Sequence, residues 1–168
     1  MERLWAPWRM AYILAEEKPE GCLFCQRARE TECDREHYVL QRAEYCYVML
    51  NAYPYNNGHL MVVPYLHVAD LIALPEGPLG EMMRLTAQWT CRLRRVMSPD
   101  GFNIGLNLGE VAGAGIVEHI HLHIVPRWQG DTNFMPVVGE TKVIPEHLLR
   151  TYDKLHAALE AENKGEPT

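Results

Sequence analysis

Three histidines alternate with aliphatic residues in the segment HIHLHIV, and this alternation constrains the fold more than any other feature of the chain. The histidines are His119, His121 and His123. Successive side chains of a β-strand point to opposite faces. The pattern therefore predicts a strand over 119–125, with three imidazoles about 7 Å apart on one face and the aliphatic side chains in the core. The alternative explanation is a metal-binding strand or a chance run of buried histidines.

The rest of the chain is predicted to form short strands separated by turns, and two longer helices. Apolar residues at steps of three and four predict a helix over 81–97, after prolines and glycines between Pro75 and Gly80 interrupt the chain. We expect further strands over 38–40, 46–50, 59–63 and 102–107, and a last helix over about 145–159. These elements predict an α+β fold, in which an antiparallel five-stranded sheet carries a long central helix and a C-terminal helix on one face.

Length, charge and hydropathy narrow the class of protein. The 168 residues favour a single domain over 1–168, with an N-terminal arm over 1–20 and a frayed tail over 160–168. The formal net charge of −6 argues against a general nucleic-acid binder, which usually carries a basic surface. No apolar run is long enough to span a membrane, and the N-terminal segment lacks the apolar core of a signal peptide. We therefore expect a cytoplasmic protein.

A row of imidazoles beside a glycine-rich loop suits phosphate chemistry. A neutral imidazole is a nucleophile near neutral pH, provided that its second ring nitrogen donates to an acceptor such as a backbone carbonyl. A neighbouring protonated imidazole holds phosphate oxygens or gives a proton to the leaving group. The segment AGAG at 112–115 offers backbone N–H groups that approach phosphoryl oxygens closely, although such a loop is also an ordinary turn.

The segment HIHLHIV resembles the signature of the histidine-triad family, in which His-x-His-x-His precedes two apolar residues. The resemblance extends from Cys22 to Trp128 and includes HLMVVPYLH and NLG. The flanking segments LWAPWRMAYI and PRWQGDTNFMPV are similar to the bacterial branch of diadenosine tetraphosphate phosphorylases or ATP adenylyltransferases. The resemblance implies the family's fold, a homodimer, and an enzyme that cleaves dinucleoside polyphosphates.

The resemblance also implies roles for four residues in the reaction. The middle histidine of the triad, His121, is the nucleophile that attacks the α-phosphate and forms a covalent nucleotidyl-histidine. His123 contacts the phosphate and assists the leaving group, and Asn107 lies near the scissile bond. His59 matches a histidine that lies near the triad in relatives. Inorganic phosphate is the expected second acceptor, and water is the alternative.

Substrate contacts are implied at five further positions. Asn51 occupies the place of a ribose-binding acid or amide, and Trp128 is expected to border the nucleotide pocket. Many relatives carry Gly-Gln-Ser/Thr before the triad, whereas this chain has an apolar stretch there that includes Gly113, Gly115 and Ile116. Backbone amides of this loop must then contact the phosphate without help from a glutamine or hydroxyl side chain.

Cys22 and Cys25 form a C-x-x-C pair, the spacing of a metal knuckle, a redox motif or two ordinary reduced cysteines. Two thiolates and two imidazoles make a tetrahedral structural zinc site. His67 and His119 are the candidate imidazoles. Galactose-1-phosphate uridylyltransferases and several bacterial histidine-triad proteins are similar here, and this resemblance implies one structural zinc ion bound by these four residues.

Other functions are also compatible with the sequence. One is hydrolysis of adenosine phosphoramidates or of dinucleoside polyphosphates, and another is a non-catalytic nucleotide-binding or zinc-stabilised scaffold. Removal of adenylate from DNA ends is disfavoured by the acidic balance and by the lack of a basic extension. Trp5 and Trp8 are expected to serve in packing or at a dimer contact, with cover of the nucleotide base as the alternative, and we assign no role to Lys142.

Overall fold

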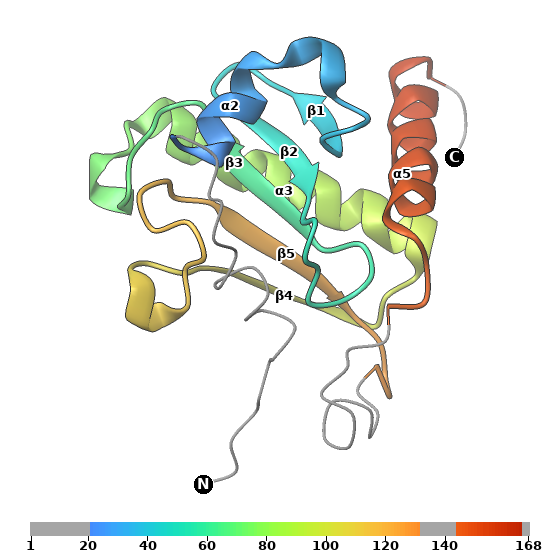
Figure 1. Ribbon diagram of the computed structural model, residues 1–168. Helices are drawn as coiled ribbons and strands as arrows, with labels where there is room; N and C mark the ends of the chain where they lie inside the picture. The colour runs from blue at the N-terminus through green and yellow to red at the C-terminus, as the bar shows by residue number, and fades with distance from the viewer. Residues whose placement is uncertain (1–20, 132–143, 166–168) are drawn as a thin grey trace, which may run out of the picture.

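An antiparallel sheet of five strands forms the centre of the computed structural model, which describes residues 21–131 and 144–165 (Figure 1). The predicted α+β class is confirmed. The predicted N-terminal arm, its two tryptophans and Lys142 lie outside the described residues. The strands are β1 (Val39–Arg42), β2 (Cys46–Leu50), β3 (Leu60–Pro64), β4 (Gly101–Leu106) and β5 (Leu122–Arg127).

The order of the strands is β1-β2-β3-β5-β4, so the histidine-bearing strand lies inside the sheet. It pairs with β3, where Met61 is opposite His123 and Val62 is opposite Leu122, and with β4, where Gly105 is opposite His123. This register places the loop before β3 near His123 and the loop after β4 near His121, so segments about 50 residues apart in the sequence lie at the two ends of this histidine pair.

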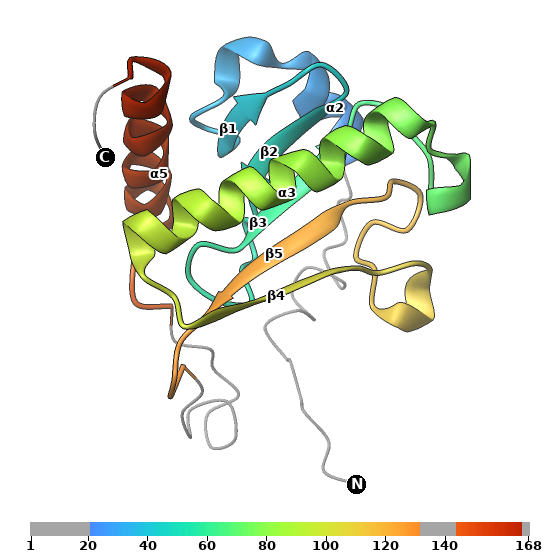
Figure 2. The same cartoon turned by 180° about the vertical axis from the view of Figure 1, so that it is seen from behind.

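Helix α3 (Glu76–Met97) crosses one face of the sheet, and α5 (Leu148–Asn163) packs beside it, as Figure 2 shows. Trp89 and Leu93 of α3 are fully buried, as is Leu155 of α5. Burial of each such side chain stabilises the fold by about 1.5–3 kcal/mol. This side holds the larger of the two hydrophobic cores. Of the helices in the described ranges, none is long and apolar enough to cross a membrane.

Helix α3 begins at Glu76, five residues before the predicted start. The prolines that were expected to interrupt the chain stand where a helix tolerates them. Pro75 is the N-cap residue, and Pro78 lies in the first turn, where backbone N–H groups have no intrahelical acceptor. The buried Glu81 carboxylate accepts hydrogen bonds from the backbone N–H groups of Tyr45 and Cys46, and this ties the early part of α3 to the start of β2.

Strand β5 begins at Leu122, so the predicted strand over 119–125 is too long at its start. Pro64 ends β3 and has no N–H group with which to continue the ladder. The backbone N–H of Ile120 bonds instead to the carbonyl of Val68. The predicted alternation of faces persists, because Ile120 lies in the same core as Leu122. Helix α5 also continues to residue 163, so the predicted frayed tail is helical over 160–163.

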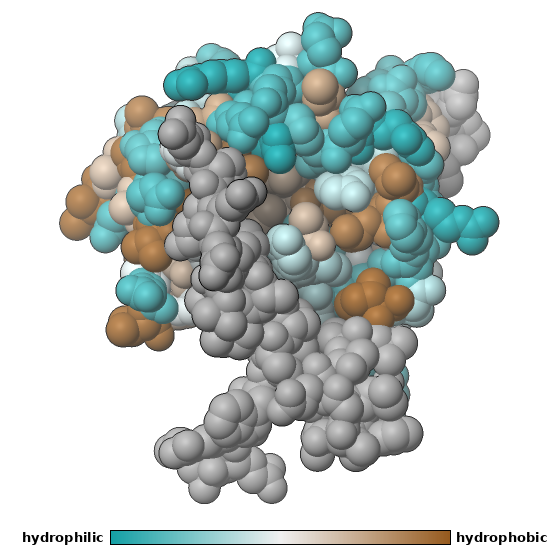
Figure 3. All heavy atoms as spheres, in the orientation of Figure 1, coloured by the Kyte–Doolittle hydropathy of each residue, from teal (hydrophilic) through white to brown (hydrophobic). Residues whose placement is uncertain are grey.

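The opposite face of the sheet carries a second, smaller core under the short helix α2 (Leu23–Arg29). The two predicted long helices share one face of the sheet, as expected, and α2 adds a short helix on the opposite face (Figure 1). Figure 3 shows hydrophilic side chains over α2 and hydrophobic ones at the left edge of this face, near the 3-10 helices η2 (Leu71–Ala73) and η3 (Glu110–Ala112). The remaining 3-10 helix, η1, is Thr31–Cys33.

Replacing Gly58 by alanine is expected to destabilise the protein by about 1–3 kcal/mol. Its φ is +70°, and a Cβ atom there would lie 2.7 Å from Met97 Sδ. Gly80 is the matched control: it is helical, and an added Cβ would meet no atom within 4 Å, so Gly80→Ala is expected to stabilise the helix by about 0.5–1 kcal/mol. Urea unfolding measures both changes, and equal stability of the two variants would contradict this account.

Candidate active site

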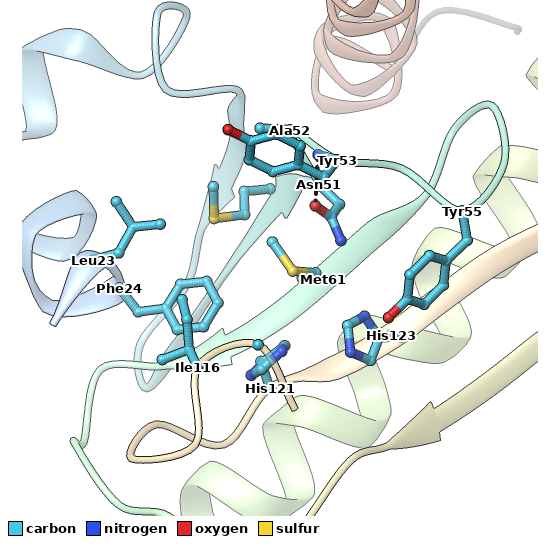
Figure 4. Close-up of a pocket in the computed structure, with 12 residues that line it drawn as sticks. Leu23, Phe24, Asn51, Ala52, Tyr53, Tyr55, Met61, Ile116, His121 and His123 are labelled. Atoms are coloured by element: carbon cyan, nitrogen blue, oxygen red, sulfur yellow. Dashed lines mark hydrogen bonds between the residues drawn. The ribbon is translucent and has the colours of Figure 1, made fainter. Parts of the chain in front are cut away.

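A pocket opens on the α2 face of the sheet, above the strands that carry the histidines (Figure 4). One end is apolar, and the other carries imidazole, amide and phenol groups. The lining residues are Leu23, Phe24, Met49, Asn51, Ala52, Tyr53, Tyr55, Met61, Gly115, Ile116, His121 and His123. The apolar end offers contact area to a flat ring, and the polar end offers hydrogen-bond donors to an anion.

The register of the sheet explains why these side chains meet. Met49 of β2 is opposite Met61 of β3, which is opposite His123 of β5. Residues in one such row share a face of the sheet. His121 stands on the same face, two residues before His123, and the two imidazole centroids are 4.7 Å apart.

His121 is fixed in one tautomer by the backbone. It is 6% exposed, and its Nδ1 lies 2.9 Å from the carbonyl oxygen of His119. A carbonyl oxygen only accepts hydrogen bonds, so Nδ1 carries the proton and Nε2 carries the lone pair of the neutral ring. The ring of Phe24 packs against this imidazole with 4.8 Å between centroids. The arrangement fits a nitrogen nucleophile at Nε2, as the sequence predicted.

His123 has the opposite tautomer, which is set by His59. The backbone N–H of Tyr55 donates to Nδ1 of His59 at 3.1 Å, so His59 carries its proton on Nε2. That proton is donated to Nδ1 of His123 at 2.9 Å. The neutral His123 ring therefore carries its own proton on Nε2, where it can serve as a donor to a phosphate oxygen.

Asn107 and the glycine-rich loop lie beside the triad. Asn107 follows the last residue of β4, and the strand register continued by one residue sets it opposite His121. Its Nδ2 donates to the carbonyl of Gly113 at 3.4 Å, and Gly113 has a φ of +90°. The structure brings Gly115 and Ile116 into the pocket lining, whereas Asn107 and Gly113 are not among the lining residues and bond to each other.

Asn51 lines the pocket at the end of β2, as predicted. Its Oδ1 accepts a hydrogen bond from the backbone N–H of Tyr53 at 2.9 Å, a turn that orients the side-chain amide. Nδ2 lies 3.5 Å from Nδ1 of His59, between the apolar end of the pocket and the imidazoles. An amide at this point suits hydrogen bonds to the hydroxyls of a ribose.

Trp128 is not brought to this pocket, contrary to the sequence-based expectation. Its indole N–H donates to the carbonyls of Met97 and Ser98, and its side chain lines a different hollow near the start of α5. The residue follows the far end of β5, about 20 Å along the strand from His121. A strand that passes through a sheet carries its two ends to opposite edges of the domain.

The apolar wall and the two tyrosines of the pocket were not predicted from the sequence. Phe24 is buried between the two cysteines of the C-x-x-C pair, and it contacts the rings of both His119 and His121. Tyr53 and Tyr55 belong to the turn that follows β2. The signals were the aromatic residues of CLFC and NAYPYNNG, but their proximity to the triad depends on how α2 and this turn fold over the sheet.

A second cluster, which we call the Cys/His cluster, consists of Cys22, Cys25, His67 and His119. One ligand atom from each residue lies within 4.8 Å of the others. Nε2 of His119 donates to the carbonyl of Pro64 at 2.8 Å, so its Nδ1 is the atom that faces the cysteines. Nδ1 of His119 lies 3.2 and 3.6 Å from the two sulfur atoms, and Nδ1 of His67 lies 3.3 Å from Cys25 Sγ.

These distances fit a tetrahedral metal ion. Bonds of about 2.3 Å to sulfur and about 2.05 Å to nitrogen place neighbouring S and N ligands roughly 3.6 Å apart. Burial raises the pKa of the Cys25 thiol, with a further contribution from the neighbouring Cys22. Burial lowers the pKa of His119 and keeps its ring neutral. The donor set therefore includes the neutral imidazole of His119 and thiols that a cation would convert to thiolates.

Comparison with protein families gives one decisive match, to the HIT domain over residues 33–130. The chain belongs to the HIT, or histidine-triad, family. A HIT protein from Mycobacterium tuberculosis, named AP-4-A phosphorylase, is 44% identical over 163 residues, which cover 94% of this chain and 83% of that protein. The adenosine 5′-monophosphoramidase of Saccharomyces cerevisiae is 28% identical over 107 residues, which cover 64% of this chain and 63% of that protein.

Solved HIT structures share the fold. A Zn-bound histidine triad family protein from Mycobacterium smegmatis superposes with a TM-score of 0.68 at 26% identity, over 87% of this chain and 98% of that one. The predicted family and fold are thus confirmed by sequence and by structure.

The tautomers of the two histidines that line the pocket, His121 and His123, are directly measurable. We expect ¹⁵N–¹H correlation spectra at neutral pH to show the proton of His121 on Nδ1 and the proton of His123 on Nε2. The reason is that the His119 carbonyl accepts from Nδ1 of His121, whereas Nε2 of His59 donates to Nδ1 of His123. The same nitrogen protonated in both rings would contradict the assignment. His156 is the control, because its ring stacks on Tyr152 of α5 and is not one of the hydrogen-bonded histidines of the pocket.

Proposed function

We propose that the protein cleaves dinucleoside polyphosphates, with diadenosine tetraphosphate as the model substrate, at an α-phosphate through a covalent nucleotidyl-histidine on His121. The observation that carries the proposal is the 2.9 Å contact of His121 Nδ1 with the His119 carbonyl, which leaves the lone pair of the nucleophile on Nε2. The pocket beside this imidazole has one apolar and one polar end, as a nucleotide requires. The 44% identity to a protein named AP-4-A phosphorylase supports the same activity.

In the first step, Nε2 of His121 forms a bond to the α-phosphorus, and the bond from that phosphorus to the bridging oxygen breaks. The electron pair of the broken bond stays on the bridging oxygen, and ATP is the leaving group. The adenine ring lies against the apolar end, and Asn51 binds the ribose. His123, with its proton on Nε2, donates to a phosphate oxygen as charge moves to the leaving group.

In the second step, an oxygen of inorganic phosphate attacks the same phosphorus and releases His121, and the product is ADP. With water as the acceptor the product would be AMP. We favour phosphate because the relative named above is a phosphorylase. In the loop before the triad, Gly115 and Ile116 line the pocket and carry no polar side-chain atom, so the acceptor is bound by backbone N–H groups there.

Replacing His121 by asparagine is expected to lower the turnover of diadenosine tetraphosphate by at least about 10³-fold, because the nucleophile is removed. Nucleotide binding should be retained, because asparagine keeps a polar group in the same space. Chromatography of the nucleotides, with and without inorganic phosphate, measures turnover. Mass spectrometry of the acid-quenched wild-type protein should show one added adenylyl group, which the variant lacks.

The reaction products distinguish the possible functions. ADP and ATP formed only with phosphate identify a phosphorylase, whereas AMP and ATP formed without phosphate identify a hydrolase. Unchanged turnover in His121→Asn would contradict the mechanism. An inert wild-type protein would favour phosphoramidate hydrolysis, the activity named for the yeast relative, or a non-catalytic scaffold.

We also propose that the Cys/His cluster binds one structural zinc ion. Two cysteines and two histidines form a closed tetrahedral donor set, and a zinc ion bound by four protein ligands has no open position for substrate. The ion would join α2 to the turn after β3 and to the first histidine of the triad. The Zn-bound relative supports this metal.

Elemental analysis tests the zinc proposal. The wild-type protein, purified without added metal, is expected to contain about one zinc per chain, and Cys25→Ser well under half of that. Cys91→Ser is the matched control, because Cys91 is exposed on α3 outside the cluster, and it should keep the full zinc content. Loss of the ligand is also expected to lower the thermal midpoint, because metal binding contributes to folding. A wild-type protein with no bound metal would contradict the proposal.

We further propose a homodimer that pairs through β4. No described strand pairs with the outer edge of β4, and Ile104 in this strand is 47% exposed. An edge strand with an exposed apolar side chain is a template for pairing with another chain. The cytoplasmic location stays a prediction from the sequence.

A further inference from the structure

We propose that the Tyr55 hydroxyl contacts the leaving polyphosphate and makes the site selective for substrates that extend beyond the α-phosphate. The inference rests on the proposed function, and it assigns a substrate contact to a residue that the sequence analysis did not single out. Tyr55 lies in the turn between β2 and β3, is half-buried and lines the pocket.

Tyr55 is held against the histidine pair by its ring and by its backbone. Its ring centroid is 4.7 Å from that of His59 and 5.8 Å from that of His123. Its backbone N–H donates to Nδ1 of His59. The phenol ring is therefore positioned by the same residue that sets the tautomer of His123, and Figure 4 shows its hydroxyl pointing toward His123.

The position of Tyr55 along the pocket decides which part of a substrate it meets. Phe24 and Ile116 mark one end of the pocket, and Tyr55 lies at the other, beyond His121 and His123 (Figure 4). A nucleoside at the apolar end places its α-phosphate at His121. The phosphates that follow must then pass His123 in the direction of Tyr55.

The chemistry of the pocket favours a neutral donor at this point. None of the described residues that line it is lysine or arginine, so neutral N–H and O–H groups recognise the phosphates there. When Nε2 of His121 bonds to the α-phosphorus, the bond to the bridging oxygen breaks and the electron pair stays on the leaving phosphate. The Tyr55 O–H donates a hydrogen bond to that phosphate and transfers no proton. A hydrogen bond to a charged group that strengthens in this step contributes about 10- to 100-fold in rate.

Tyr55→Phe tests the inference, because it removes only the hydroxyl and keeps both the ring and the backbone N–H. We expect kcat/KM for diadenosine tetraphosphate with phosphate to fall about 10- to 100-fold. Tyr45→Phe is the matched control: Tyr45 is 40% exposed, lies in the turn between β1 and β2, and does not line the pocket. It should change kcat/KM less than about twofold, as surface substitutions usually do.

Binding of AMP and ATP separates a phosphate contact from a structural role. Calorimetry in the His121→Asn background, which prevents turnover, should show that Tyr55→Phe weakens ATP at least about fivefold and AMP less than about twofold, because only ATP reaches the hydroxyl. Equal weakening of AMP and ATP, or an unchanged kcat/KM, would overturn the inference. A wild-type protein that does not turn over diadenosine tetraphosphate would overturn the proposed function, and this inference with it. An active wild type with an unaffected Tyr55→Phe overturns the inference alone.

Discussion

The hydrogen bond from His121 Nδ1 to the carbonyl of His119 connects the chemistry of the site to the rest of the fold. It decides which nitrogen of His121, the proposed nucleophile, carries the lone pair. The carbonyl is held in place because the His119 ring is itself fixed, by the carbonyl of Pro64 on one side and by the Cys/His cluster on the other. The end of β3 and helix α2 thus act together on one backbone group.

The two faces of the sheet differ in function: one stabilises the domain and the other forms the pocket. The face under α3 and α5 is a continuous apolar core, and it supplies most of the burial that stabilises the domain. The other face has a smaller core under α2, and the remaining area becomes the pocket. Because alternate residues along β5 and the residue before it point to opposite faces, Leu122 and Ile124 anchor the strand while His121 and His123 line the pocket.

Several features were predictable from local sequence. The period-two alternation of the triad predicted which side chains share a face. The Cys/His ligand set was implied as a group by the family resemblance, and the structure brings its ligand atoms within 4.8 Å. Errors arose where context overrides local signals. Proline in the first turn of α3 was interpreted as a break, although a helix start has no acceptor for that N–H. Trp128 was expected at the pocket because the resemblance to the bacterial branch implied it, but β5 carries it to the far edge.

The sequence by itself determined the residue types and periodicities: three imidazoles on one face of a strand, a C-x-x-C pair, and apolar stripes for a sheet and two helices. The tertiary structure decided the tautomers of His121 and His123, the placement of Phe24 against the nucleophile, and the position of Tyr55 beyond the triad. The physical reason is that a tautomer depends on the partner of each ring nitrogen. The partner of His121 is the carbonyl of His119 in the same segment, whereas the partner of His123 is His59, at the end of the turn after β2, which only the pairing of the strands brings to the triad.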